Sequence, residues 1–164
     1  MTVQAVEPVV KEIEVGIPPH EAFELFTERM ASWWLSSHSI GAEPFADIVI
    51  EPRPGGRWFE RSAKGTECDW GRVLVWEPPL RLVLAWQLDA NWQYRSDVSS
   101  ELEVSFTAVG EGATRVHLEH RGIEGLGGDS AELRAAFDGE GGWAGLLSAF
   151  QAMAWPSPRA AAPH

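Results

Sequence analysis

The residue with the clearest capacity for chemistry is His120. It lies near the end of the run Thr114 to Arg121, whose alternation places Val116, Leu118 and His120 on one face of a strand. A histidine among apolar neighbours can donate to a ligand carbonyl or exchange protons near its unperturbed pKa of about 6.5. The alternative is a buried histidine whose ring nitrogens are satisfied by backbone groups or water, because buried polar groups usually have partners.

The other reactive side chains lack partners at a useful spacing. His117 and His120 lie three apart on a strand and therefore point to opposite faces, and His38 falls in a polar loop. Cys68 has no partner that would make it a nucleophile, so we interpret it as a small strand residue. The run 125–128 is rich in glycine but lacks the lysine and hydroxyl of a phosphate-binding loop, which indicates a linker. We expect no metal ion and no cofactor.

Arginines recur along the strands expected in the middle of the chain, at Arg57, Arg61, Arg72 and Arg81. We interpret them as part of a solvated outer face of a sheet. The alternative is that one of them lies near Trp58 or Trp76, where it makes a cation–π contact or holds a ligand carboxylate.

The bulk composition indicates a single-domain protein. The 164 residues are 45% hydrophobic, so we expect one domain over residues 1–154 and a disordered tail over 155–164. The formal net charge of -11 argues against nucleic acid and anionic membrane surfaces as partners. Three features favour the cytoplasm. The chain has a single cysteine, it has no apolar run near the roughly 18 residues that span a bilayer, and it has no signal-peptide pattern.

Most of the chain before residue 122 has the period of strands. Alternation predicts strands at Val9–Val15, Phe45–Glu51, Arg57–Ser62, Trp70–Trp76, Leu80–Leu88, Val98–Ala108 and Thr114–Arg121. The inner face should carry Leu82, Leu84, Trp86 and Leu88, then Leu102, Val104 and Phe106. A helix is predicted from His20 to Met30, followed by a helical turn at Ala31–Leu35 and a mobile loop at Ser36–Pro44 over a cavity mouth.

The C-terminal segment Asp129–Ala154 has the period of one long amphipathic helix. Asp129 and Glu132 form a capping-box pattern at its start. The glycines at 139, 141 and 142 disturb this pattern, so either the helix begins in earnest near Gly142 or the glycines let another backbone approach closely. A long helix after many strands must bury its apolar stripe against them, which predicts an α+β protein with an antiparallel curved sheet wrapped around the C-terminal helix.

The runs 51–60 and 70–86 resemble the activator of heat-shock protein 90 ATPase homologue branch of the SRPBCC superfamily, which includes START and birch-pollen-allergen-like proteins. Residues 100–106, His120-Arg121-Gly122 and Gly142-Trp143 match the same branch. The resemblance spans Val9 to Ala154 and implies a helix-grip fold. The superfamily contains lipid carriers, hormone receptors, polyketide cyclases and oxygenase subunits, so the resemblance does not select one activity.

Nine tryptophans stand against one tyrosine, and tryptophan suits the wall of a pocket as well as a core. We therefore expect a hydrophobic or aromatic small molecule to bind between the sheet and the C-terminal helix. The expected pocket walls are Trp34, Trp58, Trp70, Leu84, Trp86, Leu102, Val104, Phe106, Leu118, His120, Trp143 and Leu147. A structure in which side chains fill that space would contradict the hypothesis.

Two alternatives remain open. A polyketide cyclase or dehydratase-like enzyme would use the same cavity with His120 moving a proton, but it should pair His120 with another ionisable group, and no inward carboxylate is evident nearby. The family name implies a third role, a protein-interaction domain that activates a chaperone ATPase.

The expected partner is a hydrophobic small molecule, with no nucleic acid and no membrane insertion, and the protein is expected to be a monomer or a homodimer.

Overall fold

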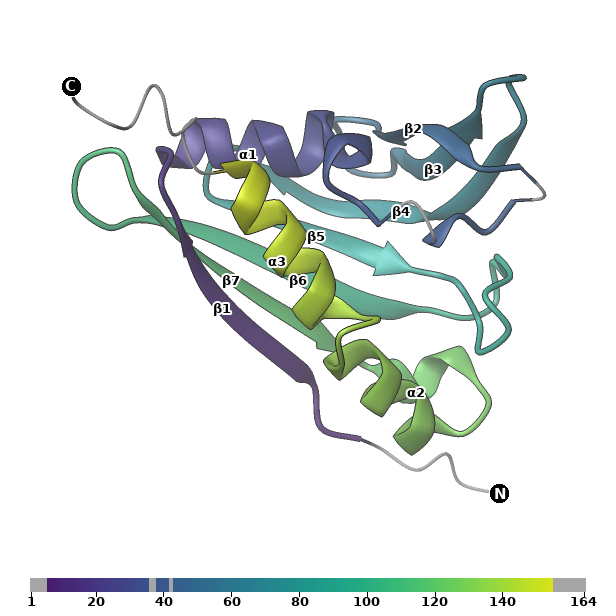
Figure 1. The fold of residues 1–164 in the computed structure, drawn as a ribbon. Helices are drawn as coiled ribbons and strands as arrows, with labels where there is room; N and C mark the ends of the chain where they lie inside the picture. Colours follow the sequence, from purple (N-terminus) through teal and green to yellow (C-terminus); the bar gives the residue numbers. More distant parts are fainter. Residues whose placement is uncertain (1–5, 36–37, 42, 155–164) are drawn as a thin grey trace.

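The computed structural model describes residues 6–35, 38–41 and 43–154 (Figure 1). Its strands form one antiparallel sheet in the order β1-β7-β6-β5-β4-β3-β2, so β1 and β2 are the edges. The strands are β1 (Val9–Val15), β2 (Phe45–Ile50), β3 (Arg57–Ser62), β4 (Glu67–Glu77), β5 (Arg81–Trp86), β6 (Ser100–Ala108) and β7 (Thr114–Arg121). The predicted α+β class with a curved antiparallel sheet is confirmed. The predicted tail at 155–164 lies outside the described residues, as do residues 36, 37 and 42 of the predicted loop.

Helical segments cover one face of this sheet. They are α1 (Pro19–Glu28), the 3-10 turns η1 (Met30–Ser32) and η3 (Ile123–Leu126), α2 (Ser130–Asp138) and α3 (Trp143–Ala154). Figure 1 shows α1 and α3 on the same side of the curved sheet. Residues 122–128 are not a plain linker, because Ile123 and Leu126 of η3 are buried in the core. In the part of the chain that the structure describes, no helix is both long and apolar enough to cross a membrane.

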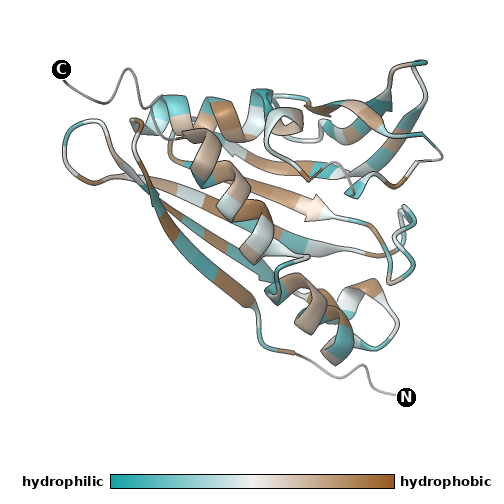
Figure 2. Ribbon diagram, in the orientation of Figure 1, coloured by the Kyte–Doolittle hydropathy of each residue, from teal (hydrophilic) through white to brown (hydrophobic). Residues whose placement is uncertain are grey.

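Strand parity correctly identified the inner face. On β5, β6 and β7 the inward residues are buried, and they include Leu84, Val104 and Leu118. Figure 2 shows the corresponding alternation of hydrophobic and hydrophilic residues along the strands. Val83 and Ala85, on the opposite face of β5, are also buried, and they pair across the sheet with Glu103 and Arg72 respectively. A sheet with one apolar face has a strongly specified register, which is why the alternation could be interpreted reliably.

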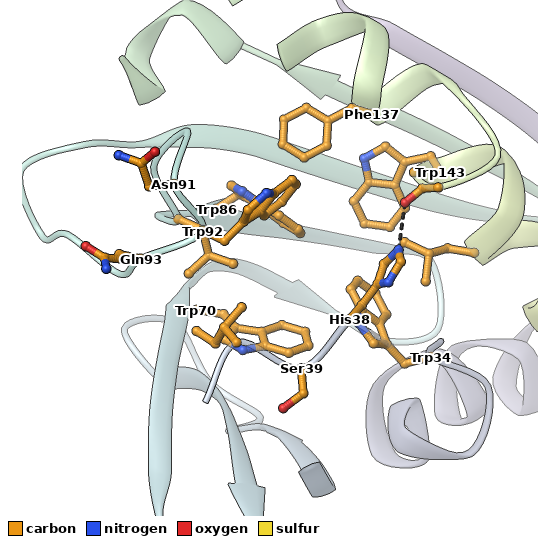
Figure 3. Close-up of a pocket in the computed structure, with 15 residues that line it drawn as sticks. Trp34, His38, Ser39, Trp70, Trp86, Asn91, Trp92, Gln93, Phe137 and Trp143 are labelled. Atoms are coloured by element: carbon orange, nitrogen blue, oxygen red, sulfur yellow. Dashed lines mark hydrogen bonds between the residues drawn. The ribbon is translucent and has the colours of Figure 1, made fainter. Parts of the chain in front are cut away.

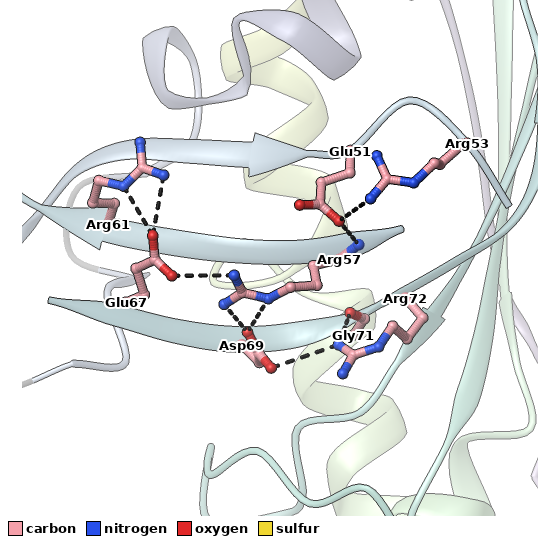
Figure 4. A network of polar contacts seen from close by, with 8 residues as sticks. All are labelled: Glu51, Arg53, Arg57, Arg61, Glu67, Asp69, Gly71 and Arg72. Atoms are coloured by element: carbon pink, nitrogen blue, oxygen red, sulfur yellow. Dashed lines mark hydrogen bonds and ion pairs between the residues drawn. The ribbon is translucent and has the colours of Figure 1, made fainter. Parts of the chain in front are cut away.

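The outer face of β3 and β4 carries a network of ion pairs (Figure 4). Arg57 pairs with Asp69 at 2.5 Å and with Glu67 at 3.1 Å, and Arg61 also pairs with Glu67. The guanidinium groups of Arg57 and Arg61 lie 4.0 Å and 5.3 Å from the centre of the Phe59 ring. The predicted solvated outer face is therefore present, with a cation–π contact to Phe59 rather than to Trp58 or Trp76.

The C-terminal helical segment is divided at its glycines. The Asp129 carboxylate accepts a hydrogen bond from the Glu132 backbone N–H at 3.1 Å, as the capping pattern predicted. The helix α2 ends at Asp138, and α3 starts at Trp143, so the segment is not one unbroken helix. A Cβ atom at Gly142 would lie 2.3 Å from the carbonyl oxygen of Phe137. Both predicted alternatives therefore apply: the helix restarts after Gly142, and glycine permits a close backbone approach.

The glycine break gives a test of stability. We expect Gly142→Ala to lower the free energy of unfolding by about 1–3 kcal/mol or more, because the new methyl group overlaps backbone atoms of the preceding turn. Gly141→Ala is the matched control, since a Cβ there meets no atom within 4 Å. Denaturant titration of both variants measures the difference. Equal stabilities of the two variants would contradict the steric explanation of the break.

Candidate functional site

A cavity of about 440 Å³ lies where α2 gives way to α3 (Figure 3). It is bounded by the loop 38–40, the turn 91–93 and the glycine break. The lining residues are Trp34, His38, Ser39, Ile40, Trp70, Trp86, Leu88, Asn91, Trp92, Gln93, Phe137, Gly141, Gly142, Trp143 and Leu146. Six of the fifteen lining residues are aromatic and four carry polar side chains, and small-molecule sites combine apolar walls with placed polar groups in this way.

The structure brings together only some of the predicted wall residues. Trp34, Trp70, Trp86 and Trp143 line the cavity. The other eight are buried in the core and do not line the cavity. They are Trp58, Leu84, Leu102, Val104, Phe106, Leu118, His120 and Leu147. On the facing sides of α3 and the sheet, Leu147 and Phe150 of the helix and Val104 and Phe106 of β6 are all buried, and Phe150 also packs on Phe26 of α1 with 5.5 Å between ring centres. The cavity lies at the start of α3, where four of the twelve predicted wall residues line it.

Trp92 and Phe137 are lining residues that the sequence analysis missed. Trp92 is 45% exposed, and its ring centre lies 5.8 Å from Phe137 and 6.5 Å from Trp86. The turn that carries Trp92 is held by Asp89, whose carboxylate accepts from the backbone N–H groups of Asn91 and Gln93. The available signal was a large aromatic residue within a polar segment that forms a turn.

Glu60 fixes one wall of the cavity. It is 2% exposed and accepts the indole N–H of Trp70 at 3.0 Å. The same carboxylate accepts from the backbone N–H of Ile40 at 2.8 Å and from the hydroxyl of Ser39 at 2.5 Å. It therefore ties the loop 38–41 to the sheet. Glu60 shares the inner face of β3 with Trp58 and was not foreseen as an inward carboxylate, but it does not pair with His120, whose hydrogen-bond partners are Ser100 and Trp143.

His120 fixes the opposite wall. The indole N–H of Trp143 donates to His120 Nδ1 at 3.0 Å. Since Nδ1 accepts, the neutral ring carries its proton on Nε2, which donates to the Ser100 hydroxyl at 2.8 Å. That hydroxyl donates in turn to the carbonyl of Trp86. Burial lowers the pKa of His120 to about 3. His120 is therefore a buried histidine whose two ring nitrogens both have hydrogen-bond partners, as the second alternative proposed. The partners are the side chains of Trp143 and Ser100 rather than backbone groups or water.

Two further wall tryptophans are held differently. The indole N–H groups of Trp34 and Trp86 are buried and have no hydrogen-bond partner within the described ranges. Their rings pack against other aromatic rings, for example Trp86 edge-on to Phe137 at 5.3 Å and Trp34 edge-on to Trp143 at 5.8 Å. Ring packing of this kind is less directional than a hydrogen bond. The cavity therefore has two walls fixed by polar anchors and two fixed by aromatic contacts.

His38 is the ionisable side chain among the lining residues. Its Nε2 lies 2.7 Å from the carbonyl oxygen of Gly141, so it joins the loop to the glycine break across the cavity mouth (Figure 3). A carbonyl only accepts, so Nε2 carries a proton.

Cys68 lies in β4 away from the cavity, and burial raises the pKa of its thiol. Over residues 6–35, 38–41 and 43–154, no group of three His, Cys, Asp or Glu side chains is placed to hold a metal ion.

The buried His120 makes stability depend on pH. The pKa of its folded form is about 3 against an ordinary 6.5, so its contribution to stability is complete above pH 6.5 and is lost as the pH falls toward 3. We expect the unfolding free energy of the wild type to fall more steeply than that of His120→Gln, by about 1 kcal/mol per pH unit between about pH 6 and pH 4. Denaturant titrations at several pH values measure both slopes.

In this comparison His120→Gln is the control. Glutamine keeps one acceptor and one donor for the partners of His120, but it does not titrate. Arginine or lysine lowers the pKa of some carboxyl groups, such as Glu103 and Asp138. Their protonation also lowers the unfolding free energy as the pH falls, and it does so equally in the wild type and in the variant. Parallel slopes for wild type and variant would contradict a neutral buried His120.

Comparison with known proteins places this architecture in a family. A family model described as "Activator of Hsp90 ATPase homolog 1-like protein" matches residues 17–154. No curated protein matches the chain. Among solved structures, the anthrahydroquino-gamma-pyrone synthase Txn09, complexed with SUM, shares 37% identity over 90% of this chain and 97% of its own, with a TM-score of 0.65.

Two further structures resemble the chain. The self-sacrificing resistance protein CalC from Micromonospora echinospora is 28% identical over 96% of this chain and 97% of its own, with a TM-score of 0.69. Protein MLL2253 from Mesorhizobium loti, at 20% identity over 90% of this chain and 96% of its own and a TM-score of 0.64, is similar in fold alone. The resemblance to this branch of the SRPBCC superfamily is confirmed, and the chain belongs to the family of activator of Hsp90 ATPase homolog 1-like proteins.

Proposed function

We propose that the protein binds a hydrophobic, ring-containing small molecule in the cavity at the start of α3. The observation that carries this proposal is the cavity itself, whose 440 Å³ falls within the roughly 300–1,000 Å³ of small-molecule sites. Six aromatic side chains contribute to its walls, namely Trp34, Trp70, Trp86, Trp92, Phe137 and Trp143. Aromatic walls bury large apolar area and pack well against flat rings.

The comparisons support the same proposal. Members of this family share a fold suited to ligand binding, and the Txn09 structure is described as a synthase in a complex. The name of that protein refers to a fused ring system. A cavity with flat aromatic walls suits a ligand of related shape. A location in the cytoplasm and the monomeric or dimeric state remain predictions.

A ring-forming enzyme is the second candidate. The observation in its favour is His38, because it places a group that can exchange protons at the wall of the cavity. His120 is a weaker choice for this role, since it is buried and does not line the cavity. Closure of an oxygen heterocycle by addition of a phenol to an unsaturated ketone requires removal of one proton and delivery of one proton to carbon. A single histidine can perform both transfers.

The binding proposal is tested with 1,8-dihydroxyanthraquinone. We expect saturable quenching of tryptophan fluorescence and a rise in melting temperature, because a ligand that binds only the folded state stabilises it. Gly141→Phe should weaken binding at least tenfold, since Gly141 borders the cavity and a Cβ atom there has no protein atom within 4 Å to oppose the larger side chain at its base. Isothermal titration calorimetry gives the affinities.

Gly139→Phe is the matched control for this experiment. Gly139 lies in the same break, does not line the cavity, and has only ordinary contacts at its Cβ position. This variant should bind the probe as the wild type does. Absence of saturable binding to the wild type, or equal loss in both variants, would count against the cavity as the binding site.

The enzyme candidate is tested with 2'-hydroxychalcone. Its isomerisation to flavanone forms a carbon–oxygen bond and moves one proton from oxygen to carbon, so no further reactant is needed. We expect chalcone absorbance to disappear faster with the wild type than in buffer alone. The rate with His38→Ala should be at least tenfold lower than with the wild type, because proton transfer by a positioned side chain contributes about 10²-fold or more. His120→Gln should retain the rate. No acceleration by the wild type would reject this activity toward chalcones.

A further inference from the structure

We infer that the turn 89–93 is the specificity-determining element of the cavity, and that it selects an uncharged, flat, fused-ring molecule that stacks on Trp92. This inference rests on the proposed binding function and makes it more specific. Three independent features of the described residues support it: the backbone conformation of Trp92, the partial exposure of its ring, and the distribution of charge around the cavity.

The first feature is an unusual backbone conformation. Trp92 has a φ of 61°, and it is the only non-glycine residue with positive φ in the part of the chain that the structure describes. Bulky residues rarely adopt this left-handed conformation, because Cβ then crowds the backbone. Residues held in such conformations cluster at binding sites, where the surrounding structure maintains them.

The turn around Trp92 maintains this conformation through hydrogen bonds to Asp89. The backbone N–H of Trp92 donates to the carbonyl of Asp89 at 2.9 Å, and the backbone N–H of Asp89 donates to the carbonyl of Gln93 at 2.9 Å. The carboxylate of Asp89 accepts from Asn91 at 2.8 Å and from Gln93 at 3.1 Å. Four hydrogen bonds therefore centre on one residue and keep Trp92 in its strained position.

The second feature is the placement of the Trp92 ring. Figure 3 shows Trp92 beside Trp86, and Asn91 and Gln93 flank it on the same turn and also line the cavity. Trp92 contacts Trp86 and Phe137 edge-on, yet 45% of the residue remains exposed. A partly uncovered indole at the mouth of an aromatic cavity offers a stacking surface to a flat ring.

The third feature is the charge around the cavity. None of the lining residues is a lysine, arginine, aspartate or glutamate. Two carboxylates lie behind the lining residues. Glu60 accepts hydrogen bonds from Trp70 and Ile40 of the wall, and Asp89 accepts from Asn91 and Gln93 of the turn. An anionic ligand would lose water, would meet no lysine or arginine among the lining side chains, where His38 is the one ionisable group, and would be repelled by both carboxylates. A cationic ligand would be attracted by both carboxylates, but it would also lose water and would find no carboxylate among the lining side chains to pair with directly.

The experiment compares three anthraquinones that differ only in one substituent at position 2: a hydroxymethyl group, a carboxylate or a trimethylammoniomethyl group. Affinities for the wild type are measured by isothermal titration calorimetry. We expect the neutral probe to bind at least tenfold more tightly than either charged probe.

The variant Trp92→Asn tests the role of the turn, because asparagine adopts the left-handed conformation readily and replaces the indole ring by a small amide. Its melting temperature should stay close to that of the wild type, while its affinity for the neutral probe should fall at least tenfold. Leu80→Asn is the matched control, since Leu80 is 64% exposed in the β4–β5 connection and does not line the cavity. It should bind all three probes as the wild type does.

The outcomes separate this inference from the function on which it rests. Preference of the wild type for the neutral probe, together with a loss of at least tenfold in affinity for that probe in Trp92→Asn and none in Leu80→Asn, supports the inference. Equal or tighter binding of a charged probe, or wild-type affinity in Trp92→Asn, overturns it and leaves the binding function intact. If no probe binds the wild type, the binding function fails for fused rings and the inference fails with it.

Discussion

The hydrogen bond from the Trp143 indole to His120 determines much of the arrangement around the cavity. Trp143 is the first residue of α3, and His120 stands on the inner face of β7, so this bond at 3.0 Å attaches the start of the helix to the sheet. An apolar interior permits such a bond only if both partners are satisfied, and Ser100 completes the pairing. With α3 attached at this point, the chain from α2 must reach it through the tight glycine break. The cavity lies at that break because no helical side chain occupies the space.

The two pairs of wall tryptophans differ in how firmly they are held. Trp70 and Trp143 each donate to a buried polar partner, so rotation of either ring would leave an unpaired donor or acceptor in an apolar environment. Trp34 and Trp86 have no such bond within the described ranges, and only packing holds their rings. A small rotation of these two rings therefore breaks no hydrogen bond. The cavity combines two rigid walls with two that can adjust to the outline of a ligand.

The sequence was sufficient for the sheet and insufficient for the cavity, for physical reasons. Alternation identified the inner residues of β5, β6 and β7 because only one face of the sheet is apolar. It could not show which inner side chains leave a gap, because that depends on how α3 packs, and eight of the twelve predicted wall residues lie in the filled core. Glu60 was missed although it shares parity with Trp58. A buried carboxylate is tolerated there only because Trp70 and the loop 38–41 provide its donors, and those contacts are tertiary.

The segments that bound the cavity are distinct from the core. The cavity is bounded by the loop 38–40, the turn 91–93 and the glycine break, whereas the middle of α3 packs with buried residues. These segments are connections rather than sheet or helix, and connections accept changes in sequence without loss of the core. The polar anchors Glu60 and His120 hold the wall beneath them. Residues at the cavity mouth can therefore change without disturbing these anchors, which is why the fold alone does not define a ligand.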